Sequence, residues 1–315
     1  VLVAGDVFDK QGLSDVSLRR VIHAMGGFTG RWILLPGNHD AALAESVWSR
    51  LQRLDVVPSN VSILSTPHVI EYAELGFAVL PAPLTQRQTH ADVTEFFDAV
   101  ETPPGLLRIG LAHGSVQGVL PDAADSTNPI AADRAETARL DYLALGDWHG
   151  TRRVDARTWY SGTPEPDRFK ANDSGNVLIV EVTGRDAAPA VEPVPVARYR
   201  WLEQSLDFSV TSDVDRLDAM LAEIGGNDVV ALRLAGRVDL RLQREIRDRV
   251  EVAKARARLL EVDDVDLRLS PTDADIAALG ADGYLGEVLS TLRETAGDPV
   301  AAEALNILAG LLADR

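Results

Sequence analysis

The sequence predicts an α/β fold, and three observations support this prediction. Apolar runs alternate along the first two hundred residues with segments whose apolar side chains recur at helical spacing. The apolar runs lack polar alternation, which is typical of strands that are buried on both faces. Polar residues follow where these runs end, and α/β proteins gather ligand-binding groups at the carboxyl ends of their strands. We therefore expect a sheet that is covered by helices or by a second sheet.

The elements of the first part can be placed in order along the chain. Apolar runs predict strands within 1–6, 61–64, 76–83, 158–166 and 175–182, and strands followed by loops within 31–40, 106–115 and 141–150. Helical spacing predicts helices within 15–27, 41–54 and 90–101. The first of these helices ends at Gly26 and Gly27, and Asp40 is a candidate N-cap of the second.

A change in composition separates this part from the rest of the chain. Residues 185–200 are rich in Pro and Ala and indicate a linker or an irregular edge segment. Strand, helix, strand and helix patterns follow between residues 200 and 259, enough for a small α+β domain over 200–270. Ala and Leu at helical spacing predict a helical tail over 271–315. No internal repeat is visible.

Composition excludes several classes of protein. The 315 residues include no cysteine, so disulfides and thiolate metal sites are excluded and an intracellular, cytoplasmic protein is the expectation. No stretch is long and apolar enough to span a bilayer, so we expect no membrane partner. A net charge of −17 argues against a uniformly basic nucleic-acid surface but leaves room for a local basic patch.

Four loops after predicted strands carry residues that can bind metals. They are GDVFD with Asp6 and Asp9, GNHD with Asn38 and His39, AHGS with His113, and GDWHG with Asp147 and His149. Mixed carboxylate, amide and imidazole ligands suit Mn²⁺, Fe²⁺ or Zn²⁺ better than a calcium site made only of oxygens. Two such ions about 3.5–4 Å apart can hold the attacking and leaving oxygens of a displacement at phosphorus.

The order of these loops resembles the calcineurin-like metallophosphoesterase superfamily. The later YSGTPEPDRF, followed by GNVLIVEV, is similar to the SbcD-type DNA repair exonucleases. The resemblance covers about residues 1–199, which it identifies as a nuclease domain. It implies a four-layer α/β/β/α sandwich, followed by the capping domain over 200–270 and the helical tail. It also implies two divalent cations, with Mn²⁺ favoured, and DNA as a partner.

The resemblance implies a role for each loop residue. Asp6 would bridge the two metals, Asn38 and His113 would bind the second, and His149 would bind the first. His39 would not bind metal but would stand over the phosphate, where it could stabilise charge or protonate the leaving oxygen. Asp9 would orient its loop through hydrogen bonds. Each residue also has an ordinary alternative, such as a turn aspartate or a hydrogen-bonded loop histidine.

The sequence departs from the family pattern at two places. The last loop of the family is usually G-H-x-H, and Asp147 stands here at the position of the first histidine. A carboxylate can bind Mn²⁺ or Fe²⁺, but it is shorter than imidazole and adds negative charge. The family's first motif, D-x-H, would precede Val1, so we expect the chain to lack an N-terminal segment that supplies two ligands to the first metal.

Several surface features favour particular partners. Five basic residues follow the metal loops and could contact a DNA backbone: Arg152, Arg153, Arg157, Arg168 and Lys170. Arg152 and Arg153 are the main candidates for substrate binding. The amphipathic tail is compatible with docking on an SbcC-like coiled-coil ATPase, and a homodimer is an open alternative. His23 lies on a predicted helix with apolar neighbours and is expected to be structural.

The sequence therefore predicts metal-dependent phosphodiester hydrolysis on DNA by an exonuclease subunit of a repair complex. Two alternatives stay open. The chain could hydrolyse small phosphodiesters or nucleotides, or it could be a catalytically impaired subunit of an ATPase complex.

Overall fold

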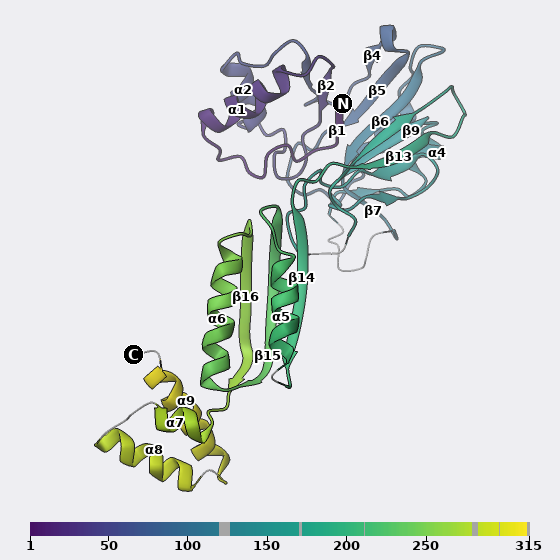
Figure 1. Cartoon of the computed structure of the whole chain (residues 1–315). Helices are drawn as coiled ribbons and strands as arrows, with labels where there is room; N and C mark the ends of the chain where they lie inside the picture. The colour runs from purple at the N-terminus through teal and green to yellow at the C-terminus, as the bar shows by residue number, and fades with distance from the viewer. Residues whose placement is uncertain (120–126, 170–171, 211, 279–282, 296, 314–315) are drawn as a thin grey trace. The chain divides into compact units, whose positions relative to one another are not determined.

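In the computed structural model the chain divides into two compact units, Val1–Ala197 and Arg198–Arg315 (Figure 1). The structure describes residues 1–119, 127–169, 172–210, 212–278, 283–295 and 297–313. Both units mix helices and strands, in agreement with the predicted α/β class. Among the described residues, no helix has the length and apolar character needed to cross a membrane.

Two sheets form the frame of the first unit. The smaller sheet is parallel and has the order β1 (Leu2–Val3), β2 (Trp32–Leu34) and β3 (Val61–Ile63). The larger has the order β10 (Arg152–Arg153), β11 (Thr158–Tyr160), β9 (Tyr142–Gly146), β6 (Leu107–His113), β5 (Phe77–Ala82) and β4 (Ile70–Tyr72). Its β4–β5 and β10–β11 pairs are antiparallel, and its other pairs are parallel.

Smaller elements complete this unit. Two short sheets pair β7 (Ser115–Val116) with β8 (Pro129–Ile130) and β12 (Asn176–Glu181) with β13 (Ala190–Pro195). The helices are α1 (Asp15–Gly26), α2 (Val47–Arg53), α3 (Phe96–Ala99) and α4 (Arg134–Thr137), with 3-10 turns η1 (Ala73–Leu75) and η2 (Val93–Glu95).

Three apolar clusters hold these elements together. Leu34 of β2 packs with the α1 and α2 side chains Leu18, Ile22 and Trp48. Its chain neighbours Ile33 and Leu35 belong to a second cluster, which also contains Val79 of β5 and Leu111 of β6. A third cluster joins the larger sheet to α3 and α4, through residues that include Leu143, Phe97 and Ala135. The alternation along β2 thus directs one face toward helices and the other toward the larger sheet.

The second unit contains a three-stranded parallel sheet, β14 (Arg200–Phe208), β15 (Asp228–Val238) and β16 (Leu259–Leu269). Helices α5 (Asp213–Ala222) and α6 (Leu240–Lys254) share one apolar cluster with this sheet. The tail forms α7 (Asp273–Ala278), α8 (Tyr284–Glu294) and α9 (Pro299–Ala313). Leu289 of α8 and the α9 residues Ala301, Leu305 and Ala309 are buried, and these α9 positions are spaced four apart.

The helix predicted within 41–54 is half as long as expected. It begins at Val47, because Ser46 and Ser49 form a reciprocal capping box. Asp40 is therefore not its N-cap, and that prediction is wrong. The backbone of residues 41–46 is engaged elsewhere, since Gln11 Nε2 donates to the Ala41 carbonyl (2.9 Å) and Ala42 N donates to the Leu84 carbonyl (2.7 Å).

Three other predictions differ from the structure. The helix predicted within 90–101 is reduced to η2 and the single turn of α3. Six residues of the segment expected to be a linker or irregular edge, 185–200, form β13, whose Val191 and Val194 pair with Val180 and Val177 of β12. Strand β16 was not predicted, because its many exposed acidic residues hide the apolar pattern.

Candidate active site

Glycine allows the ends of both sheets of the first unit to meet. A Cβ on Gly37 would lie 2.2 Å from Asp6 Oδ1, and a Cβ on Gly5 would lie 2.1 Å from His113 Nδ1. A Cβ on Gly146 would lie 1.8 Å from the Ala4 carbonyl oxygen. Each of these glycines directly precedes Asp6, Asn38 or Asp147, so the Gly-Asp and Gly-Asn pairs in the sequence reflect close backbone approach.

His113 lies at the centre of the residues that converge. It is the last residue of β6 and is almost fully buried, at 1 % exposure. Its Nδ1 lies 2.7 Å from the Ala4 carbonyl, which follows β1 in the other sheet. Because a carbonyl only accepts hydrogen bonds, Nδ1 carries the proton and Nε2 faces the remaining groups.

Three oxygen atoms surround His113 Nε2. Asn38 Oδ1 lies 3.1 Å away, Asp6 Oδ2 3.4 Å and Asp147 Oδ1 3.6 Å. The structure therefore brings together four of the predicted metal ligands, from four separate strand ends. A neutral imidazole would direct a lone pair toward these oxygens, so a proton on Nε2 or a cation among the four groups would stabilise the arrangement.

The electrostatics of this group follow from its burial. Burial alone would lower the pKa of His113, but its hydrogen bond to Asp6 and the charges of Asp6 and Asp147 outweigh burial and raise that pKa. Burial opposes ionisation of Asp6 as well, yet contacts with His113 and the His39 N–H lower its pKa. The pKa of Asp147 is raised by burial and, despite His113, by the nearby Asp6 carboxylate.

Both carboxylate residues of the converging group have strained backbone. Asp6 has φ 53° and Asp147 has φ 95°, in the left-handed region that side chains other than glycine rarely adopt. Such conformations persist where surrounding structure enforces them, and they cluster at functional sites. The sequence contains no signal for these dihedral angles.

His39 is held beside the converging group without joining it. Its backbone N donates to Asp6 Oδ1 (2.9 Å), and its side chain is half exposed. The ring Nδ1 lies 2.9 Å from the Asp9 carbonyl and 3.4 Å from Asp9 Oδ1. Asp9 thus orients the imidazole through Nδ1, which leaves Nε2 to face a ligand as a donor or an acceptor according to protonation.

The His149 imidazole contacts residues of the following loop. Its Nδ1 lies 2.9 Å from Asp167 Oδ2 and 3.1 Å from Arg168 Nη2. Asp167 also pairs with Arg168, and the hydrogen bond from that guanidinium is the main reason why the pKa of Asp167 falls to about 2. His149 stays a predicted metal ligand, and Asp167 and Arg168 are neighbours that the sequence did not indicate.

The predicted substrate-binding arginines make contacts within the protein. Arg152 Nη2 donates to the Val119 carbonyl (2.6 Å). Arg153 donates to the Asp155 carbonyl (3.0 Å) and lies over the Trp159 ring. Arg157 donates to the carbonyls of residues 186 and 187. Lys170 lies outside the described residues.

Two supporting residues were missed by sequence reasoning. The buried Tyr160 hydroxyl donates to the Gly114 carbonyl (2.8 Å) and accepts from Val116 N (2.9 Å), so it fixes the loop after His113. The Asp40 carboxylate is fully buried, and burial is the main reason why its pKa rises to about 6. The sequence pointed to Asp40 only as part of GNHD and as a candidate helix N-cap, and no local pattern points to Tyr160.

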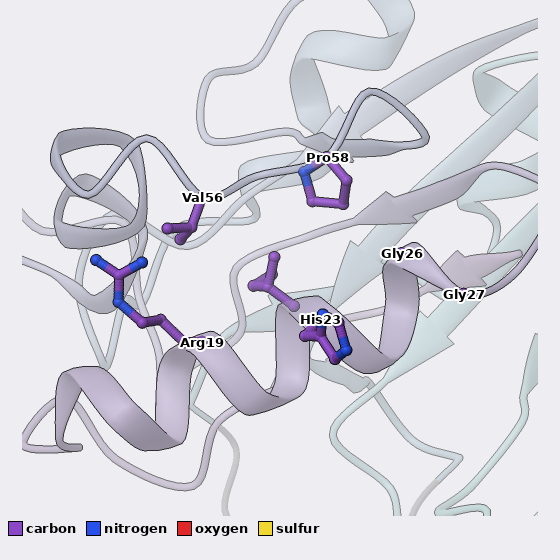
Figure 2. A pocket seen from close by; sticks show the side chains of 7 residues that line it. Arg19, His23, Gly26, Gly27, Val56 and Pro58 are labelled. Carbon is purple, nitrogen blue, oxygen red and sulfur yellow. The ribbon is translucent and has the colours of Figure 1, made fainter.

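A hollow of about 540 Å³ lies elsewhere on the first unit, between α1 and the segment before β3 (Figure 2). Its lining includes Arg19, Ile22 and His23 of α1, together with Val56 and Pro58. The lining contains none of the predicted site residues, and its one histidine, His23, is expected to be structural. The hollow is therefore separate from the converging group.

The converging group has the donor types of a divalent-cation site, but its side chains are not arranged as a preformed one. Among the described residues, no group of three or more His, Cys, Asp or Glu side chains stands as a ready-made metal site. Asp6, His113 and Asp147 are included in this statement, so a cation here would also need the Asn38 amide oxygen and an adjustment of the side chains. Two ligands about 2.1 Å from one ion are about 3.0–3.5 Å apart at octahedral or tetrahedral angles. The distances from His113 Nε2 to the three oxygens, 3.1, 3.4 and 3.6 Å, lie in or near this range.

Comparison with known proteins adds no relationship, since the chain matches no protein-family model and no curated protein.

Proposed function

We propose that the first unit is a metal-dependent phosphodiesterase that acts on DNA, as a cytoplasmic exonuclease subunit in DNA repair. The observation that carries the proposal is the convergence of Asp6, Asn38 and Asp147 on His113 Nε2, with the half-exposed His39 beside them. A partly exposed cluster of carboxylate and amide oxygens around the buried His113, next to an oriented and accessible imidazole, suits the chemistry of phosphate esters.

The fold that we propose with this activity is the four-layer α/β/β/α sandwich. The three apolar clusters of the first unit support it. One lies between α1–α2 and the smaller sheet, one between the two sheets, and one between the larger sheet and α3–α4. A site between sheets places its ligands on rigid strand ends, which favours fixed geometry.

Each residue of the group has a proposed role. Asp6, Asn38, His113 and Asp147 would hold one divalent ion, with Mn²⁺ favoured by the three oxygen donors. Asp6 would also face a second ion, to which His149 would bind. Bound ions would supply Lewis-acid stabilisation of phosphate charge and would lower the pKa of a nearby water.

The remaining residues act on the substrate or on one another. Asp9 holds His39 through Nδ1, so that Nε2 of His39 faces the phosphate and stabilises charge or transfers a proton to the leaving oxygen. Arg168 pairs with Asp167 and thereby restricts the His149 ring. Arg152 and Arg153 would contact the DNA backbone with the donors that their internal hydrogen bonds leave available.

The second unit is proposed to serve partners of the nuclease. Its α5–α6 domain would be the capping domain, and the tail helices α7, α8 and α9 would dock on an SbcC-like coiled-coil ATPase. Several apolar side chains of α9 support this role, since Val300, Ile307 and Leu311 are exposed. Homodimerisation is an alternative use of the same helices.

A direct assay tests the proposed activity. The purified chain is incubated with Mn²⁺ and either end-labelled linear duplex DNA or the chromogenic substrate bis(p-nitrophenyl) phosphate. We expect both to be cleaved, with release of nucleotides from DNA ends. Asp6→Asn should remove the activity, whereas Asp15→Asn, a change at an exposed carboxylate paired with Arg50, should retain it.

The other outcomes each select a different function. Cleavage of the chromogenic substrate alone would replace DNA with small phosphodiesters as the substrate class. No cleavage, together with near-zero manganese, iron and zinc by elemental analysis after metal incubation, would contradict the enzymatic proposal and favour an impaired subunit of an ATPase complex.

A further inference from the structure

The Asp40 carboxylate joins two of the loops that carry the candidate site. Its Oδ1 accepts a hydrogen bond from Gly37 N at 2.6 Å, and its Oδ2 accepts one from Phe8 N at 3.1 Å. Gly37 directly precedes Asn38, and Phe8 lies two residues after Asp6. One buried side chain therefore holds the backbone of both the loop that carries Asp6 and the loop that carries Asn38.

A second hydrogen bond runs between the same loops in the opposite direction. Asp6 Oδ1 accepts a hydrogen bond from His39 N at 2.9 Å. The loop of residues 6–8 therefore donates to Asp40 and accepts from His39, and both of these residues belong to the GNHD loop. The surroundings of Asp40 are closely packed. Its backbone carbonyl accepts from the buried Trp48 Nε1, and the Trp48 ring packs edge-on against Phe8 with centroids 5.3 Å apart.

We propose that Asp40 is a positioning residue that sets the distance between Asp6 and Asn38, and thereby the affinity of the candidate cation site. It acts through the N–H groups of Phe8 and Gly37 and does not touch the cation. The inference rests on the proposed function for the presence of a cation. The hydrogen bonds of Asp40 are formed between residues of the chain and do not depend on a bound cation.

Only a group with two acceptor atoms satisfies this position. Each oxygen of Asp40 serves one N–H, whereas asparagine would direct its own NH₂ group at one of the two donors. Asp40→Asn keeps the size of the side chain and must lose one of the two bonds. Partners that orient metal ligands typically contribute about 10- to 100-fold to metal affinity.

The first unit offers a closely matched control in Asp141. This carboxylate is also buried, at 2 % exposure, and it likewise serves one N–H with each oxygen: Arg108 N at 2.8 Å and Asp186 N at 3.2 Å. It lies at the amino end of β9, whereas Asp147 follows the carboxyl end of that strand. Asp141→Asn therefore removes one of two N–H acceptors away from the candidate site, and it also weakens the 3.9 Å ion pair with Arg157, so it is the more disruptive of the two changes for the fold.

The test measures Mn²⁺ binding to the full chain at pH 7.5, with free Mn²⁺ counted by electron paramagnetic resonance. We expect Asp40→Asn to weaken binding by at least about tenfold and Asp141→Asn to stay within about twofold of the unaltered chain. Equal affinity of Asp40→Asn and the unaltered chain would overturn the proposal. So would equal weakening by both variants, because that result indicates general destabilisation.

A measurement on the unaltered chain covers the case in which Asp40→Asn does not fold. Because binding and positioning are linked, saturating Mn²⁺ should slow hydrogen exchange at the Phe8 and Gly37 amides. Exchange at these amides that is insensitive to bound Mn²⁺ would overturn the positioning role. If the unaltered chain binds no Mn²⁺ at all, the proposed function fails, and that result is distinct from failure of the Asp40 role.

Discussion

Gly146→Ala is a sharp test of the close contact between the two sheets of the first unit. Gly146 ends β9 and pairs with His113 in the larger sheet. An added Cβ would lie 1.8 Å from the Ala4 carbonyl oxygen and 2.8 Å from His113 Nδ1. Real Cβ contacts below 3.0 Å essentially never occur, so Ala4 and Gly146 must separate by about 1.2 Å.

The cost of this change can be estimated from two contributions. Overpacking in a well-packed interior typically costs about 1–3 kcal/mol. The separation also weakens the 2.7 Å hydrogen bond between His113 Nδ1 and the Ala4 carbonyl, and a typical hydrogen bond contributes about 1 kcal/mol. We therefore expect the free energy of unfolding of the first unit to fall by about 2–4 kcal/mol.

Urea unfolding followed by tryptophan fluorescence measures this quantity. Four of the five tryptophans, at positions 32, 48, 148 and 159, lie in the first unit, so the signal reports mainly on that unit. Gly12→Ala is the matched control, since no atom lies within 4 Å of its added Cβ. If the two variants differ in unfolding free energy by less than about 0.5 kcal/mol, the argument for close packing at Gly146 is refuted.

Four further predictions concern single side chains. His39→Ala should lower Mn²⁺-dependent turnover of bis(p-nitrophenyl) phosphate while calorimetry shows that Mn²⁺ binding is retained; loss of the metal would mean that His39 is misassigned. Asn38→Ala should weaken Mn²⁺ binding in the same titration, and unchanged affinity would remove Asn38 from the ligand set. The pKa of Asp167, about 2, lies below the ordinary aspartate value of 3.8, so its ionised form stabilises the fold above pH 3.8, and this contribution is lost as pH falls through about 2. Carboxyl NMR titration should give this low midpoint, and a midpoint near 3.8 would contradict the pairing with Arg168. Ser46→Ala should destabilise the first unit by about 0.5–2 kcal/mol in urea unfolding, because the capping box of α2 is lost; no change would show that the cap contributes nothing.

Local sequence signals were sufficient for several elements. The helix predicted within 15–27 is confirmed as α1, because Ser14 caps it, Leu18 and Ile22 form its buried stripe, and it ends before Gly27. Four apolar runs predicted strands that end at the residues of the candidate site, and these strands are confirmed as β1, β2, β6 and β9. These signals act within one or two turns or along one strand, so they can be read from neighbouring residues.

Other elements depended on contacts that a local pattern does not contain. Apolar residues at 41–46 continue the helical spacing, but Gln11 and Leu84 bind the backbone there, and the helix starts only at Val47. Strand β13 forms because β12 supplies its hydrogen bonds, although its composition indicates a linker. In both cases a distant partner outweighs the local preference.

The same division holds for the candidate site. The sequence by itself determined which residue types follow the strands, and it placed a glycine before Asp6, Asn38 and Asp147. Only the tertiary structure decided that Asp6, Asn38 and Asp147 meet at His113 Nε2. It also decided that the His149 ring contacts Asp167. Asp40 is not a helix cap, because its buried carboxylate accepts a hydrogen bond from Phe8 N in another loop. The physical reason is that the type of ligand is a property of a single residue. The distances of 3.1–3.6 Å from His113 Nε2 to the three oxygens join residues more than thirty positions apart, and they depend on how the strands and the two sheets pack.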